Sequence, residues 1–120
     1  MTLSPTDALQ NYFAAWNAPD PDTCSSYLLA ACVQDAVLVD PHARRPVEGW
    51  GAISGHIAAF REWAGEHQLE ATSAIDAHHD VCRISWQIAD GSDVRSRGLI
   101  VAEAAKDGRL KRMIHFVDPA

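Results

Sequence analysis

The chain has 120 residues, of which 48% are hydrophobic and 22% charged, and its formal net charge is −6. This length predicts a single domain over residues 1–120 that can bury a core without disulfides or metals. The acidic balance disfavours nucleic acids and anionic membranes as partners, because both attract clusters of Lys and Arg. No run approaches the roughly 18 apolar residues that a membrane-spanning helix needs.

The cysteine pattern bears on the cellular compartment. Three cysteines, an odd number without paired CxxC spacing, favour a reducing cytoplasm over a disulfide framework. Residues 1–5 lack a basic segment followed by an apolar run, so we expect no signal peptide. We therefore predict a cytoplasmic protein in which Cys24, Cys32 and Cys82 are small buried side chains.

The first predicted element is a helix that begins near Ser4. Ser4 can cap the helix, and Pro5 suits its first position. Apolar residues then recur at i, i+3, i+4 and i+7 and predict one buried face, made of Leu9, Tyr12, Phe13 and Trp16.

A second helix and a strand are predicted next. Residues 17–21 break the first helix, and Asp22 can cap a second helix that runs to about residue 31. Its expected inward side chains are Leu28 and Leu29. Residues 34–40 alternate as a strand in which Leu38 and Asp40 share one face.

The rest of the chain predicts a third helix and then an antiparallel meander. The helix covers about residues 52–66, with an inner stripe of Ile53, Ile57, Phe60 and Ala64. Strands are expected at about residues 69–76, 81–89, 94–104 and 110–117. Turn-forming residues separate them at 78–80, 90–93 and 106–109. This order of helices and strands predicts an α+β fold.

Several of these segments resemble one known superfamily. Residues 12–17 and 19–22 are similar to the opening helix and turn of the SnoaL-like and ketosteroid-isomerase-like families. Residues 37–41 and 45–49 resemble their first strand and following loop, and residues 107–110 resemble the turn before their last strand. The run Asp-Ala-His-His-Asp at residues 76–80 is similar to a bacterial branch of this nuclear-transport-factor-2-like (NTF2-like) superfamily.

The resemblance implies an architecture and a pocket. It implies a cone-shaped half-barrel, with three N-terminal helices packed on a strongly curved, mainly antiparallel sheet. The concave face would enclose an apolar pocket, and the convex face would form a homodimer. The residues expected to line the pocket are Trp16, Leu38, Ile57, Phe60, Trp63, Trp86, Met113 and Val117.

Two residues match the catalytic pair of ketosteroid isomerases. Asp40 matches their general base, and burial in an apolar cavity can raise a carboxyl pKa to suit proton abstraction. The alternative is that Asp40 simply ends the strand and accepts local backbone N–H bonds. Tyr12 matches the phenol that donates to the developing oxyanion, and the alternative is an ordinary core aromatic.

His115 is a third candidate. On the last strand Met113 and Val117 share its parity, but the opposite face is more apolar, so the register stays open. If His115 faces inward, it can pair with Asp40 and move protons in a dehydration, isomerisation or cyclisation. The alternative is a hydrogen-bonded structural histidine.

One isomerase element is missing. The resemblance implies a protonated carboxylic acid on the penultimate strand, whereas residues 97–100 read Arg-Gly-Leu-Ile. Two hypotheses remain: a cofactor-free isomerase, cyclase or dehydratase that acts on a small apolar or carbonyl-containing molecule, or a non-catalytic binding or dimerisation module.

The other histidines and arginines are expected to have mainly structural roles. His78 and His79 are expected in a turn, and none of the histidines has the spacing of a zinc-binding helix, so we predict no metal and no cofactor. Arg83, Arg95 and Arg97 are expected on the convex face in salt bridges, with Arg97 as a candidate contact to an acidic ligand.

Overall fold

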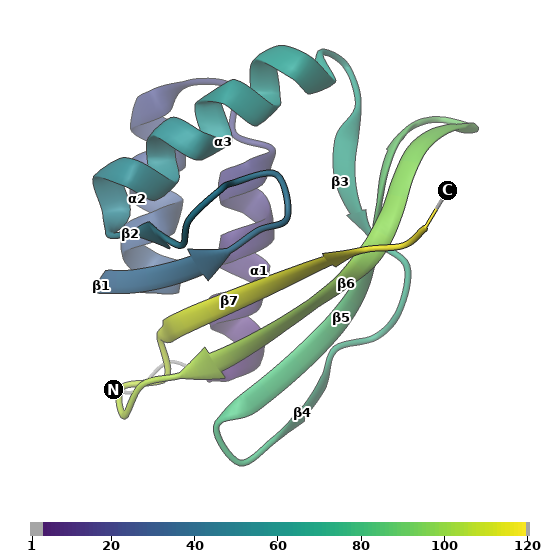
Figure 1. The fold of residues 1–120 in the computed structure, drawn as a ribbon. Helices are drawn as coiled ribbons and strands as arrows, with labels where there is room; N and C mark the ends of the chain where they lie inside the picture. Colours follow the sequence, from purple (N-terminus) through teal and green to yellow (C-terminus); the bar gives the residue numbers. More distant parts are fainter. Residues whose placement is uncertain (1–3, 120) are drawn as a thin grey trace.

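A computed structural model describes residues 4–119, which form three helices and one seven-stranded sheet (Figure 1). The helices are α1 (Pro5–Trp16), α2 (Pro21–Ala31) and α3 (Trp50–Ala64). The strands are β1 (Cys32–Val39), β2 (Val47–Glu48), β3 (Gln68–Ala71), β4 (Asp76–His78), β5 (Val81–Asp90), β6 (Asp93–Ala104) and β7 (Leu110–Val117). The sheet order is β2-β1-β7-β6-β5-β3, with β4 also paired to β5.

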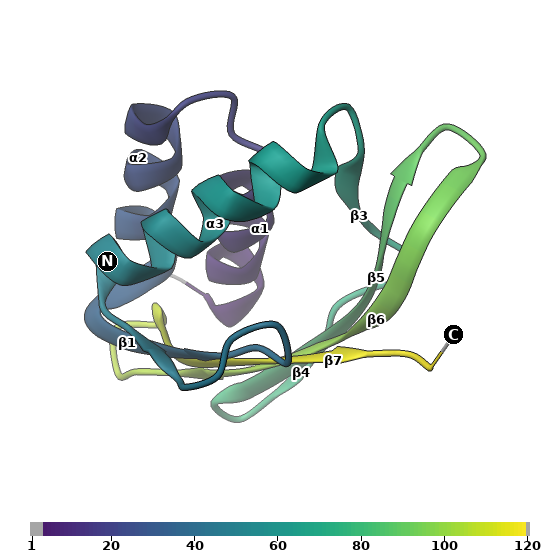
Figure 2. The ribbon, with the colours of Figure 1, turned by 45° about the horizontal axis from the view of Figure 1, so that its top comes forward.

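The helices all cover one face of the sheet, and the sheet curves around them without closing (Figure 2). The pairings are antiparallel except between β1 and β7, which run parallel. This arrangement confirms the predicted α+β cone-shaped half-barrel. The core lies between the helices and the concave face, and its largest fully buried side chains include Tyr12, Leu9, Leu28, Leu38 and Ile53.

The starts of the first two helices follow from their caps. Ser4 Oγ accepts a hydrogen bond from the backbone N–H of Asp7 at 3.1 Å, as predicted for α1. The predicted cap of α2 was wrong: Asp20 rather than Asp22 accepts from the N–H of Thr23, at 2.8 Å. Pro21 then takes the first helical position, where its missing N–H costs nothing.

The predicted inward pair on α2 was half right. Leu28 is fully buried, whereas Leu29 is 47% exposed. Consecutive helical residues are turned by about 100° from each other, so a helix that packs through one face buries only one of two neighbours.

The strands differ from prediction in three places. The strand expected over residues 69–76 is two short strands, β3 and β4, and the short strand β2 was not predicted. Between β5 and β6 the register changes from Ile88↔Ser96 to Ala89↔Val94, so Arg95 has no partner and forms a β-bulge. The turn expected near residue 79 is present, and His79 has a positive φ of 51°.

Two smaller expectations can be compared directly with the structure. Cys24, Cys32 and Cys82 are free and buried, as predicted. Among residues 4–119, no helix has both the length and the apolar character needed to cross a membrane.

Candidate active site

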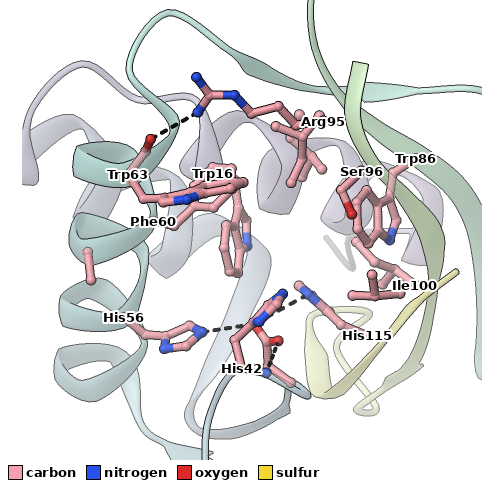
Figure 3. Close-up of a pocket in the computed structure, with 15 residues that line it drawn as sticks. Trp16, His42, His56, Phe60, Trp63, Trp86, Arg95, Ser96, Ile100 and His115 are labelled. Carbon is pink, nitrogen blue, oxygen red and sulfur yellow. Dashed lines mark hydrogen bonds and ion pairs between the residues drawn. The ribbon is translucent and has the colours of Figure 1, made fainter. Parts of the chain in front are cut away.

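A cavity of about 520 Å³ opens between α1, α3 and the concave face of the sheet (Figure 3). Its walls are mainly aromatic and aliphatic, and include Trp16, Phe60, Trp63, Trp86, Ile88 and Ile100. The Trp16 and Phe60 rings meet edge to face, with their centroids 5.0 Å apart. Trp63 is 56% exposed, so the cavity reaches the surface beside the end of α3.

Asp40 supplies the carboxylate of this cavity. It directly follows β1 and is buried on the same side as Leu38, as its parity predicts. Its Oδ1 accepts a hydrogen bond from the backbone N–H of His42 at 3.0 Å. Its Oδ2 lies 2.8 Å from Nε2 of His56, which comes from the middle of α3. The carboxylate is therefore held from two sides.

His115 reaches the same carboxylate from β7. It is buried and lines the cavity, and its Nδ1 lies 3.9 Å from Oδ2 of Asp40. Its Nε2 lies 2.8 Å from the hydroxyl of Tyr12 on α1. The inward register of the last strand is thus the one that places Met113 and His115 on the buried face.

The protonation of this chain of groups follows from burial. Burial raises the pKa of the Tyr12 phenol well above its usual value, so the phenol keeps its proton and can donate it to Nε2 of His115. Burial also lowers the pKa of His115 to about 4, although the charge of Asp40 opposes this shift. A neutral His115 that accepts at Nε2 carries its proton on Nδ1, the nitrogen that faces Asp40.

The Asp40 carboxyl group behaves differently from the sequence-based expectation. Burial alone would raise its pKa, but the hydrogen bonds from His56 and from the His42 N–H, together with the nearby His115, outweigh burial and lower it. Asp40 is consequently ionised at neutral pH. The expected raised pKa was wrong, because the contact between His56 and the carboxylate depends on tertiary packing that the sequence-based expectation did not include.

His56 is the functional candidate that sequence reasoning missed. Its side chain is 21% exposed and lines the cavity beside Asp40. A signal was available: His56, Phe60 and Trp63 are spaced i, i+4 and i+7, so they share one face of α3, and all three line the cavity. The ionised Asp40 fixes the imidazole of His56 through Nε2.

The structure divides the residues expected in the pocket. Trp16, Phe60, Trp63, Trp86 and Val117 line the cavity. Leu38, Ile57 and Met113 are instead fully buried in the core behind this lining. Tyr12 is also behind it, because its hydroxyl ends on His115 rather than in the cavity.

An indole packs against Gly98, in the segment where the resemblance implied an acid. A Cβ at Gly98 would lie 2.4 Å from Cζ2 of Trp86 and 2.0 Å from the carbonyl oxygen of Phe116. Glycine is therefore required there, and the Trp86 ring packs directly against the strand. Within residues 4–119 the indole N–H groups of Trp16 and Trp86 have no hydrogen-bond acceptor. In the same part of the chain no three His, Cys, Asp or Glu side chains gather as a metal site.

Comparisons with known proteins agree on the fold. No family model and no curated relative matches the chain. Among solved structures, it is similar to a proposed isomerase of the SnoaL-like family from Agrobacterium tumefaciens, with 26% identity, a TM-score of 0.84 and coverage of 93% of this chain and 95% of the other.

Two further structures show the same fold. One is a proposed polyketide cyclase from Sinorhizobium meliloti, with 20% identity, a TM-score of 0.69 and coverage of 92% and 94% of the two chains. The other is a proposed ketosteroid isomerase from Kribbella flavida, with 18% identity, a TM-score of 0.74 and coverage of 99% and 81%. At these identities the likeness concerns the fold alone.

Proposed function

We propose that this chain, which has the fold of the SnoaL-like and NTF2-like superfamily, is a cofactor-independent enzyme that moves protons on a small hydrophobic carbonyl compound. Its reaction class would be isomerisation, cyclisation or dehydration. The observation that carries the proposal is the ionised Asp40 carboxylate, held by His56 and facing the neutral His115 in the wall of an aromatic cavity.

The first role belongs to the pair of Asp40 and His56. A proton removed from the carbon next to the substrate carbonyl passes to this pair, which binds it as one coupled unit. The lowered pKa makes Asp40 a weak base alone. Because Nε2 of His56 already donates to Asp40, the second place for the proton in this pair is Nδ1 of His56. General acid–base catalysis of this kind contributes roughly 10²- to 10⁴-fold in rate.

The second role belongs to His115. Its Nδ1 is too far from Asp40, at 3.9 Å, for a hydrogen bond, so its proton remains available to a ligand oxygen. A neutral imidazole in this position stabilises the oxyanion that forms as the α-proton leaves. Tyr12 touches no ligand in this scheme. It is a positioning residue that fixes the tautomer of His115 through Nε2.

The test measures the step that all three reaction types share. We expect the protein to accelerate exchange of the α-protons of 2-tetralone for deuterium in D₂O, followed by proton NMR. The variants Asp40→Asn, His56→Gln and His115→Gln should each lower the exchange rate by about 100-fold or more. His78→Gln is the matched control, because His78 is exposed on β4 and remote from the cavity lining.

The competing function is a non-catalytic binding module. It is favoured by the absence of an acid side chain at residues 97–100 and by the lowered pKa of Asp40. In that case 2-tetralone would bind, with a change in tryptophan fluorescence, but would exchange no faster with wild-type protein than with the His115→Gln variant. That result would refute the catalytic proposal.

A further inference from the structure

We propose that the ligand of this cavity carries a carboxylate at the end opposite its carbonyl group, and that Arg95 binds this carboxylate at the cavity mouth. The inference rests on the cavity of the proposed function and adds a class to its substrate: a flat, apolar keto or phenolic acid. The sequence pointed to Arg97 as the contact for an acidic ligand, whereas the structure places Arg95 in the cavity lining.

Arg95 points toward the cavity because of the β-bulge. In a regular strand, alternate residues face opposite sides of the sheet. Ser96 and Gly98 would then face the concave side, and Arg95 and Arg97 would both face the convex side. The register change between Ile88↔Ser96 and Ala89↔Val94 leaves Arg95 unpaired and breaks this alternation. A bulge commonly redirects a side chain at the rim of a sheet. Arg95 consequently lines the cavity, and Arg97 does not.

The guanidinium of Arg95 is held in place but keeps free donors. One of its terminal nitrogens donates to the backbone carbonyl of Trp63 at 3.2 Å, and its central carbon lies 5.4 Å from the Trp63 ring centroid. A guanidinium has five N–H donors, so most of them remain for a ligand. These two contacts orient the group before any ligand arrives, which lowers the entropic cost of binding.

Arg95 also lacks an acidic partner among residues 4–119, unlike two other arginines of the chain. Arg83 pairs with Asp76 at 3.1 Å, and Arg109 pairs with Asp107 at 2.8 Å. No carboxylate of residues 4–119 lies within 4 Å of the Arg95 guanidinium, although the chain carries an excess of acidic groups. A ligand carboxylate can pair with this guanidinium through two parallel charge-assisted hydrogen bonds.

The two ends of the cavity favour opposite groups. Figure 3 shows Arg95 and Trp63 at one end and His56 and His115 at the other, with Trp16 and Trp86 between them. The ionised Asp40 at the histidine end repels a carboxylate, and Arg95 attracts it. The cavity therefore fixes one orientation, in which the carbonyl or phenol lies at His115 and the acid lies at the mouth.

The experiment compares two probes that share one ring system. We expect wild-type protein to bind 6-hydroxy-2-naphthoic acid at least 10-fold more tightly than 2-naphthol, as measured by isothermal titration calorimetry. Arg95→Gln should abolish this preference, because it weakens binding of the acid at least 10-fold more than binding of 2-naphthol. Arg95→Lys should retain part of the preference, because the charge remains but the two-pronged geometry is lost. Arg97→Gln is the matched control, since it removes the same charge from the next-but-one position of the same strand and should keep the preference.

Two results would overturn the inference. One is equal affinity of wild-type protein for the two probes, and the other is an equal loss in Arg95→Gln and Arg97→Gln, which would reveal only a general effect of net charge. Neither result bears on catalysis, because exchange of 2-tetralone, which has no acid group, does not need Arg95. Conversely, an acid preference without any exchange would leave this inference intact and refute the proposed reaction.

Discussion

His115 is the most unusual titratable residue of the site. It lies between the Tyr12 phenol, which is hydrogen-bonded to its Nε2, and the Asp40 carboxylate, which faces its Nδ1. The attraction of Asp40 would favour a charged imidazole, yet burial dominates and lowers the pKa of His115 to about 4. The side chain is thereby kept neutral. A neutral imidazole can donate a hydrogen bond to an oxyanion without transferring its proton, whereas an imidazolium gives up its proton readily.

The lowered pKa of His115 predicts how stability changes with acid. The unfolded chain binds a proton at this residue near pH 6.5, and the folded protein does so only near pH 4. Between these values the unfolded state binds more protons, so the free energy of unfolding falls as the pH falls. We expect a loss of about 3 kcal/mol from this residue between pH 7 and pH 4. Urea unfolding at both pH values measures it.

The His115→Gln variant isolates that contribution. All other histidines remain in the variant, so the difference between the two pH dependences belongs to His115 and its neighbours. The lowered pKa of Asp40 acts in a lower window, since its stabilising effect is lost only as the pH falls below its ordinary value of 3.8. Identical pH dependences of wild type and variant would contradict the assignment of a neutral, buried His115.

Single-residue reasoning from the sequence worked where the spacing fixed the direction of a side chain. The parity of Asp40 with Leu38 placed it on the buried face, and the inner face of the first helix placed Tyr12 in the core. The contact between His56 and Asp40 could not be deduced in this way. It depends on how α3 crosses the end of β1, which is a matter of tertiary packing and not of periodicity.

At the scale of elements, Gly98 on β6 and Gly55 on α3 offer a contrasting pair. A Cβ at Gly98 would meet the Trp86 ring and the Phe116 carbonyl oxygen, whereas a Cβ at Gly55 would meet nothing within 4 Å. We expect Gly98→Ala to lower the free energy of unfolding by about 1–3 kcal/mol or more, through overpacking. We expect Gly55→Ala to raise it by about 0.5–1 kcal/mol, because alanine favours a helix interior.

Chemical denaturation of both variants tests this pair. Gly98→Ala should also weaken 2-naphthol binding, since Trp86 must move and its ring lines the cavity. Gly55→Ala should leave that binding unchanged. A Gly98→Ala variant with full stability and full affinity would show that the Trp86 ring is not fixed against β6. It would also show that this strand has room for a side chain at position 98.

Element boundaries were predictable where local chemistry set them. Pro21 at the first position of α2 marks the preceding Asp20 as its cap. The sequence therefore contains the correct boundary, although Asp22 was predicted as the cap. The bulge at Arg95 is different in kind. It exists only relative to β5, and alternation within β6 alone predicts the wrong face for that arginine.

At the scale of the whole molecule, the convex face of the sheet, which the helices do not cover, carries an apolar patch. On β6 and β7 the opposed pairs Leu99↔Phe116 and Val101↔Ile114 are adjacent, and Val39 on β1 lies beside Ile114. All three helices lie on the other side of the sheet (Figure 2). Phe116 is 53% exposed, an unusual degree for a phenylalanine in the middle of a sheet. We define these five residues as the convex patch.

The convex patch predicts a homodimer. A second copy would remove the patch from water, and a charge at its centre should prevent this. We expect wild-type protein to have the mass of a dimer in size-exclusion chromatography with light scattering at micromolar concentration, and Phe116→Arg to have the mass of a monomer. Tyr27→Arg is the control, because Tyr27 is 38% exposed on α2, away from the sheet.

The predicted dimer interface and the cavity should be separable, because the convex patch and the cavity lie on opposite faces of one sheet (Figure 2). His115 and Phe116 are neighbours in sequence, yet His115 lines the cavity and Phe116 is exposed on the other side. The Phe116→Arg monomer should therefore still bind 6-hydroxy-2-naphthoic acid with close to wild-type affinity. A monomeric wild type, or dissociation by Tyr27→Arg as well, would contradict the predicted interface. Loss of binding in the monomer would instead show that the partner copy supports the concave face through the shared sheet.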